Sequence, residues 1–196
     1  MTKTEARRRP NTRERILAAA LDLFVERGFD GTTISDIERA VGLAAGTGSF
    51  YRHFRSKEDV FVAAVQRSAT EYIEQFLAML VELDGITDPV ERLRRDFHMR
   101  LDALQRFEPI VRLVTAERER FPELQKTFTT GLQLDQWKLG WDDHPLPGVV
   151  MAALVGYGQL SQLEDSPYRQ IAADAFIDEL VNMLTSAHVA PPVRKH

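Results

Sequence analysis

Apolar residues recur every three or four positions along most of the chain, which is the spacing of one face of an α-helix. The first such run lies between Asn11 and Gly28. Asn11 and Glu14 have the spacing of a capping box, and a glycine is a common helix end. The apolar positions between them are Ile16, Leu17, Ala20, Leu21, Phe24 and Val25. This pattern predicts a capped helix followed by a glycine turn.

Two more capping boxes follow, Thr33 with Asp36 and Ser56 with Asp59. The first opens a run of only about two helical turns, which meets Gly42. The second opens a long run that ends at residues 84–85. A short aromatic helix is expected over residues 48–54. We predict that Phe50 and Phe54, which are four residues apart, face the core there.

The same periodicity predicts the rest of the chain to be helical. We expect a helix over 87–104 that ends near Pro109, a shorter one over 110–121, and a third that begins at Pro122. A turn-rich break is expected over 140–148, then helices over 149–163 and 170–187, and a disordered tail. The fold class is therefore all-α.

The helix expected over 149–163 is apolar nearly all round, and a helix without a polar face is buried on every side. In a chain of this size a second subunit is a common cover, although burial inside one subunit remains the alternative. We predict a homodimer whose interface is formed by the last two helices. The candidate interface residues are Ala152, Ala153, Gly156, Leu160, Phe176, Leu180 and Leu184.

Composition narrows the class of protein. The chain has 196 residues, 44% of them hydrophobic, so it can bury a core. It has no cysteine, which excludes disulfides and cysteine chemistry. Its longest apolar stretch, over 149–157, is too short to span a bilayer. We therefore expect a soluble, cytoplasmic protein with no membrane partner.

Charge is distributed unevenly along the chain. The formal net charge is −4, yet residues 1–60 hold 11 Lys and Arg against 9 Asp and Glu, a balance of +2. Arg7, Arg8, Arg9, Arg13 and Arg15 cluster at the start. A basic leading end on an acidic body indicates a phosphate-binding end, while a solvated charged tail is the plainer interpretation.

Residues 33–57 combine these features. A short helix, a glycine-containing turn and a second short helix have the layout of a helix-turn-helix. Hydroxyl, basic and imidazole side chains suit phosphate and base-edge contacts. The candidate DNA-binding residues are Thr33, Ala45, Thr47, Ser49, Tyr51, Arg52, His53 and Lys57.

Three ordered motifs, GFDGTTISDIERAVG over 28–42, GSFYRHF over 48–54 and SKEDVF over 56–61, resemble the DNA-binding domain of the TetR family of bacterial transcriptional regulators. The resemblance implies a three-helix head and a larger helical body that binds a ligand and dimerises. We place the boundary between 1–57 and 58–196. The resemblance also implies that Tyr51, His53 and Lys57 contact the DNA backbone or support the contacting helix, and that Thr33 caps the helix that crosses the backbone. The turn before Tyr51 is two residues longer than is usual in the family, which lengthens either the turn or the recognition helix.

The sequence offers little for catalysis or metal binding. Asp142, Asp143 and His144 are adjacent in an expected turn and cannot readily converge on one ion. We predict no catalytic residue, no metal and no cofactor. Large rings leave gaps that a small apolar effector could fill. The candidate ligand-binding residues are Phe97, His98, Phe128, Trp137, Trp141, Tyr157 and Gln159.

The leading hypothesis is a repressor that binds double-stranded operator DNA and is released by a small, largely apolar effector. One alternative is a regulator with the same head that responds to no ligand. Another, from a different class, is a helical enzyme or small-molecule carrier. Salt-dependent binding to promoter DNA separates the regulators from the third hypothesis, and release by a ligand separates the first two.

Overall fold

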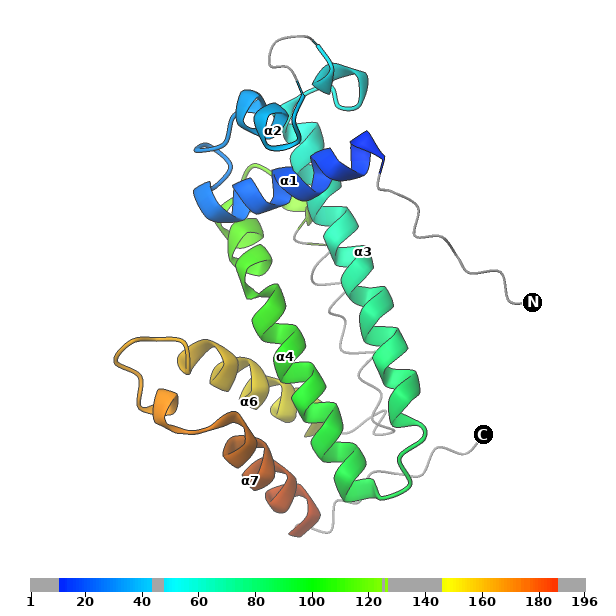
Figure 1. Cartoon of the computed structure of the whole chain (residues 1–196). Coiled ribbons are helices and arrows are strands. Elements are labelled where there is room, and N and C mark those ends of the chain that lie inside the picture. Colours follow the sequence, from blue (N-terminus) through cyan, green and yellow to red (C-terminus); the bar gives the residue numbers. More distant parts are fainter. Residues whose placement is uncertain (1–10, 44–47, 125, 127–145, 187–196) are drawn as a thin grey trace, which may run out of the picture. The chain divides into compact units, whose positions relative to one another are not determined.

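The computed structural model describes residues 11–43, 48–124, 126 and 146–186, and these residues form helices and no strand (Figure 1). The elements are α1 (Thr12–Arg27), α2 (Ile34–Ala40), η1 (Phe50–Arg52), α3 (Lys57–Leu83), α4 (Pro89–Ala116), α6 (Leu146–Leu160), η3 (Pro167–Gln170) and α7 (Ala173–Ser186). The prediction of an all-α chain with an N-terminal helix-turn-helix is confirmed. Within the described residues, no helix combines the length and hydropathy needed to cross a bilayer.

Helix ends in the first part of the chain follow the capping residues. Asn11 and Glu14 form the predicted capping box at the start of α1, and Gly28 ends the helix with a φ of 74°. That φ lies in the left-handed region, which glycine adopts without the steric cost of a Cβ. Thr33 and Asp36 form the second box, at the start of α2. These predictions are confirmed.

Four predicted helix boundaries differ from the structure. α4 is one helix that continues through Pro109, where a break between two helices was expected. The aromatic segment forms only the three-residue 3-10 helix η1 in place of a helix over 48–54. α6 begins at Leu146, three residues before the expected start, and α7 begins at Ala173. The expected break over 140–145 and the tail from residue 187 lie outside the described residues.

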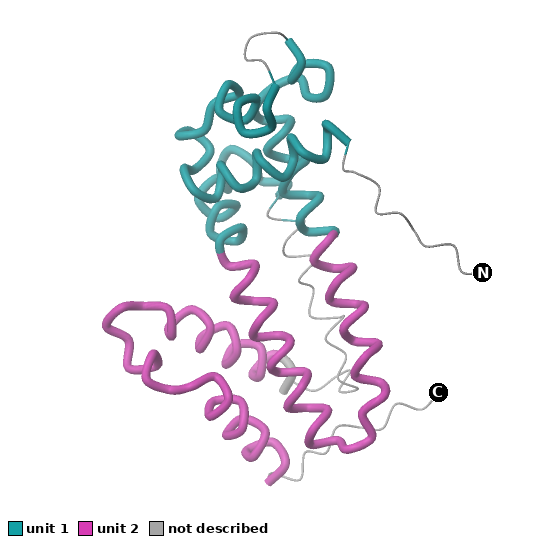
Figure 2. Tube along the Cα trace, in the orientation of Figure 1, with its two compact units in different colours: residues 1–70, 109–127 teal, residues 71–108, 128–196 magenta. Residues whose placement is uncertain are grey.

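The chain forms two compact units, one of residues 1–70 with 109–127 and the other of 71–108 with 128–196 (Figure 2). We call these the head unit and the body unit. The division falls within α3 and within α4, and the boundary expected between 1–57 and 58–196 stays a prediction. The head unit therefore contains the last part of α4 and the segment after it.

Phenylalanine rings form the centre of the head unit. Phe61 of α3 lies edge-on to Phe24 of α1 at 5.0 Å between ring centroids, and to Phe29 of the α1–α2 turn at 5.1 Å. Phe121, which follows α4, lies 4.6 Å from Phe61 and 5.2 Å from Phe29. We call these four rings the phenylalanine cluster; each has at most 5% of its surface exposed.

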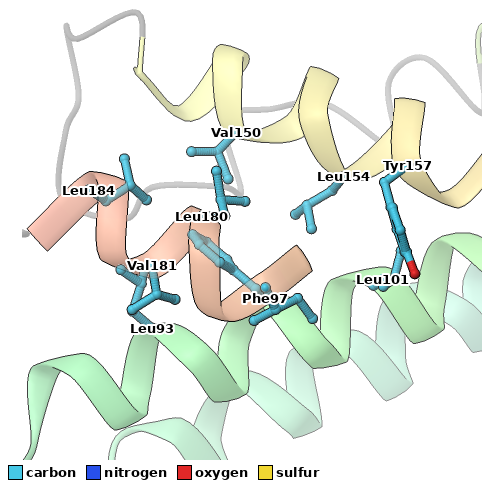
Figure 3. Close-up of a cluster of buried hydrophobic side chains, with 10 residues drawn as sticks. Leu93, Phe97, Leu101, Val150, Leu154, Tyr157, Leu180, Val181 and Leu184 are labelled. Atoms are coloured by element: carbon cyan, nitrogen blue, oxygen red, sulfur yellow. The ribbon is translucent and has the colours of Figure 1, made fainter. Parts of the chain in front are cut away.

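The body unit has its own core, formed where α4, α6 and α7 meet (Figure 3). Phe97 of α4, Leu154 of α6 and Ile177 of α7 are fully buried in it. The other members are Leu93, Leu101, Val150, Tyr157, Leu180, Val181 and Leu184. One face of each of the three helices is therefore used inside the subunit.

Leu154→Ala should lower the free energy of unfolding by about 2–5 kcal/mol, because it removes a fully buried side chain and leaves a cavity. Urea denaturation measures the change. Leu77→Ala is the control: Leu77 lies on α3 in the same unit and is 46% exposed, so its loss should matter little. Equal effects of the two variants would contradict the assigned core.

Candidate nucleic-acid interface

The turn between α2 and η1 leads into the candidate DNA-binding segment. Gly48 has a φ of 72°, a left-handed conformation in which glycine is favoured. η1 follows, and Phe50 and Phe54 are 0% and 2% exposed as predicted, with their ring centroids 5.8 Å apart. The two rings fix η1 to the core of the head unit, so the residues between them are presented at the surface.

Tyr51 and Arg52 are the exposed residues of η1, and Tyr51 has 60% of its surface accessible. His53 and Ser49, on either side of η1, are half-buried. A phenol, a guanidinium and an imidazole on one short segment can donate hydrogen bonds to phosphate oxygens. Ala45 and Thr47, the other candidates of the turn, lie outside the described residues.

Thr33 is the N-cap residue of α2. Its hydroxyl accepts a hydrogen bond from the backbone N–H of Asp36 at 3.2 Å, and the Asp36 carboxylate accepts from the backbone N–H of Thr33 at 3.1 Å. Hydrogen bonds from the Thr33 hydroxyl and backbone hold the pKa of Asp36 below its usual value. The start of α2 is therefore ordered by groups of the protein itself, and this cap does not need a DNA phosphate.

Lys57 is bound within the protein, which the sequence did not reveal. Its Nζ donates to the carbonyl oxygens of Phe29 at 2.8 Å and Thr32 at 3.0 Å, and lies 4.2 Å from the centroid of the Phe29 ring. The lysine thus ties the start of α3 to the α1–α2 turn. The resemblance implied that Lys57 either contacts the DNA backbone or supports the contacting helix. These contacts within the protein fit the supporting role.

Arg120 also contacts the α1–α2 turn. Its guanidinium donates to the Asp30 carboxylate at 2.8 Å and lies 4.7 Å from the centroid of the Phe29 ring. The hydrogen bond from Arg120 lowers the pKa of Asp30. Two cations therefore lie against the Phe29 ring, and each cation also bonds to an oxygen of the turn. Sequence reasoning missed this contact because the partners are 90 residues apart.

Two arginines of the basic N-terminal cluster also serve the fold. Arg15 donates to the carbonyl oxygen of Val41, at the end of α2. The guanidinium of Arg13 lies 4.9 Å from the centroid of the Phe54 ring. Both contacts join α1 to the segment that contains the helix-turn-helix. Arg7, Arg8 and Arg9 lie outside the described residues.

The candidate ligand-binding residues in the body unit are dispersed. Phe97 and Tyr157 are packed in the body core, where the Tyr157 hydroxyl donates to the carbonyl oxygen of Ile171 at 2.7 Å. His98 lies on α4 with its Nε2 3.7 Å from a carboxylate oxygen of Asp174, and Gln159 is exposed. Phe128, Trp137 and Trp141 lie outside the described residues, as do Asp142, Asp143 and His144.

The candidate interface residues divide into two groups. Leu180 and Leu184 are each 6% exposed and belong to the body core, so their side chains are covered within the subunit. Leu160 is 38% exposed and Ala152 is exposed. Ala153, Gly156 and Phe176 are half-buried. The surface available to a second copy is therefore narrower than the sequence suggested.

The fold and the η1 surface define an all-α protein with an N-terminal helix-turn-helix. A family model described as bacterial regulatory proteins, tetR family, matches residues 16–64, a range that contains α2, η1 and the start of α3. Over this quarter of the chain, the protein is similar to the tetR family of bacterial regulatory proteins.

One curated repressor and two solved structures are similar to this chain. The chain is 29% identical to the HTH-type transcriptional repressor KstR2 of Mycolicibacterium smegmatis over 139 residues, which are 70% of this chain and 64% of that repressor. A TetR-family regulator structure from Mesorhizobium loti MAFF303099 covers 91% of this chain and 95% of its own, with 17% identity and a TM-score of 0.64. The transcriptional regulator FadR from Bacillus subtilis, in complex with stearoyl-CoA, covers 88% and 97%, with 18% identity and a TM-score of 0.53. The two structural likenesses show the fold.

Lys57→Met should lower the free energy of unfolding by about 1–3 kcal/mol, because two carbonyl oxygens lose a charged hydrogen-bond donor. Urea denaturation again measures the loss. The matched control is Arg52→Met, which removes an exposed cation and should change stability by less than about 0.5 kcal/mol. A Lys57 variant as stable as the control would show that the lysine does not support the α1–α2 turn.

Proposed function

We propose that this protein is a sequence-specific DNA-binding transcriptional regulator that acts as a repressor. The observation that carries the proposal is the alternation in the η1 segment. Phe50 and Phe54 are buried while Tyr51 and Arg52 between them are exposed. Such a segment presents polar groups from a fixed backbone, and it lies within the range matched by the TetR family model.

DNA binding would use this surface in two ways. Arg52 and the Tyr51 hydroxyl donate to phosphate oxygens and so position the head. The turn residues Ala45 and Thr47, with Ser49 at the start of η1, are the candidates for base contacts in the major groove. Thr33 and Lys57 order the helices that hold this surface, and the His53 imidazole is a further candidate for a phosphate contact. Two heads would enter successive major grooves of a pseudo-palindromic operator.

Two copies require a dimer, and we propose that α6 and α7 form its interface. Exposed apolar side chains support this assignment. Val149 and Leu160 of α6 are 61% and 38% exposed, and Met183 of α7 is 55% exposed. A second copy is the partner that would cover them, together with Ala152, Ala153 and Gly156.

A small, largely apolar effector would bind the body and release the operator. The structure of FadR from Bacillus subtilis in complex with stearoyl-CoA gives one ligand-bound example of this fold. A ligand-independent regulator with the same head is the second candidate, and release of operator DNA by a ligand distinguishes the two. The relatives are transcriptional regulators, which disfavours the enzyme hypothesis. DNA binding implies a cytoplasmic location.

Arg52→Gln should weaken binding to an operator fragment and reduce the slope of log affinity against log salt by about one, because one phosphate contact is lost per head. Fluorescence anisotropy at several salt concentrations measures the slope. The control is Arg106→Gln, which removes an exposed arginine of α4 in the body unit and should leave the slope unchanged. The assigned surface is wrong if the two variants behave alike.

Gly156→Glu should convert the dimer to monomers, because a buried charge without a partner costs several kcal/mol, roughly 3–5. Within the subunit, a Cβ at Gly156 would meet nothing within 4 Å, so the substitution does not strain the described fold. Sedimentation velocity measures the oligomeric state, and circular dichroism confirms folding.

Gly156→Ala is the control for this variant and should remain dimeric. A well-folded Gly156→Glu dimer would place the interface elsewhere. A parent protein that is itself monomeric would contradict the proposed assembly as a whole.

A further inference from the structure

α4 carries a buried ion pair in the body unit. Arg100 Nε donates to Asp96 Oδ2 at 2.7 Å, and the two side chains are only 2% and 3% exposed. They lie one helical turn apart, so the pair is formed within α4 itself. A buried pair of this kind contributes little net stability relative to apolar residues of similar volume, because both charges lose their hydration.

The other oxygen of the same carboxylate lacks a donor. Asp96 Oδ1 is buried and accepts no hydrogen bond from the residues that the structure describes. Leaving a buried charged acceptor unsatisfied carries a desolvation cost, so such an atom calls for a water or a ligand as its partner. An ionised carboxylate accepts hydrogen bonds and donates none, so the missing partner must be a donor.

Aromatic rings line the neighbourhood of this pair. The Arg100 guanidinium lies 5.2 Å from the centroid of the Phe76 ring, and Phe76 stacks on Tyr72 at 6.1 Å. Tyr72 also lies 4.1 Å from Phe107. Burial raises the pKa of the Tyr72 hydroxyl, while the Arg100 charge opposes that rise. The ion pair therefore belongs to an apolar, aromatic environment.

This environment lies on a different face of α4 from the body core. Phe97 and Leu101 point toward α6 and α7 (Figure 3). Asp96, Arg100 and Phe107 recur at spacings of four and seven, which places them on a second stripe of the helix. The core cluster thus fills one face of α4, and the unsatisfied oxygen belongs to another.

We propose that Asp96 and Arg100 form the polar end of the effector site, and that this end takes a neutral, hydrogen-bond-donating head, such as a hydroxyl, on an apolar molecule. Asp96 and Arg100 carry opposite charges, and a neutral head adds no further charge to this buried pair. A neutral donor satisfies Asp96 Oδ1 without adding charge, and the rings contact the apolar body. The inference rests on the proposed function in that the bound molecule serves as the effector.

Three probes of matched length test this head-group preference in the full-length protein without DNA. 1-Decanol carries a neutral donor, decyl methyl ether carries no donor, and decanoate carries a charge. Intrinsic tryptophan fluorescence and thermal shift report binding. We expect 1-decanol to bind roughly tenfold or more tightly than either other probe, since a hydrogen bond to a charged group is worth that much. Equal affinities for 1-decanol and the ether would overturn the inference and leave Asp96 Oδ1 to a structural water.

The double variant Asp96→Leu with Arg100→Met tests the residues themselves. It replaces the pair by apolar side chains, which should preserve folding, and the ratio of affinities for 1-decanol and the ether should fall to about one. The matched control removes the exposed pair Arg94–Asp178 (2.7 Å, 35% and 51% exposed) by Arg94→Met with Asp178→Leu, and should keep the preference of the parent. If the Asp96/Arg100 variant still prefers 1-decanol to the ether, these two residues are not the polar end of the site. If that variant does not fold, the comparison of the three probes in the parent protein decides.

Operator binding is measured separately on the parent. Operator binding without any preference for 1-decanol overturns the inference alone, and the proposed function stands. Selective binding of 1-decanol that leaves operator affinity unchanged upholds the polar site and overturns its use as the effector site.

Discussion

Phe29 is the point on which the organisation of the head unit depends. Its ring contacts Phe24, Phe61 and Phe121, which come from α1, α3 and the segment after α4. Lys57 and Arg120 lie against the same ring and also bond to oxygen atoms of the α1–α2 turn. Burial of the phenylalanine rings draws these segments together but does not strongly fix their orientation. The hydrogen bonds and cation–π contacts of Lys57 and Arg120 add contacts of defined distance to the α1–α2 turn. Together they set where α2 begins relative to α1 and α3. The η1 segment belongs to the same unit, and Phe50 and Phe54 fix it to the core there.

The features that the sequence predicted well are those whose physical cause is local. A capping box acts over four residues, so Asn11 with Glu14 and Thr33 with Asp36 could be read directly. Pro109 misled the same reasoning. A proline inside a helix loses one backbone hydrogen bond and costs about 3 kcal/mol, which makes a break the natural expectation. Phe107 and Ile110 on either side of it are buried at 8% and 9% exposure, and burial of this kind offsets the cost of a proline. The spacing of apolar residues in the sequence does not show that packing offsets the cost of Pro109.

The site was predicted less completely, because the roles of its residues depend on partners far away in the chain. Lys57 has the charge of a phosphate contact, and only the fold shows that its ammonium is bound to carbonyl oxygens 25 and 28 residues earlier. Leu180 and Leu184 continue an apolar stripe, but a stripe does not say whether its cover is the same subunit or another; here it is the same subunit. The Asp96–Arg100 pair has the spacing of an ordinary surface ion pair on a helix, and burial alone makes it distinctive.

The continuity of α4 bears on the proposed regulation. Residues 89–108 of this helix belong to the body unit, and its remaining residues belong to the head unit, which also contains Arg120 and Phe121. A ligand at Asp96 and Arg100 would therefore contact the same helix whose far end leads to the Phe29 contacts. Continuity alone does not create coupling, because a ligand shifts an equilibrium only by the difference in its affinity for the two states. The unsatisfied Asp96 Oδ1 offers a source of that difference in affinity. A ligand with a neutral donor would stabilise a state in which this oxygen can be reached. The same ligand would not stabilise a state in which the oxygen is inaccessible. The coupling would then be limited to about the strength of that hydrogen bond and the apolar contacts that accompany it.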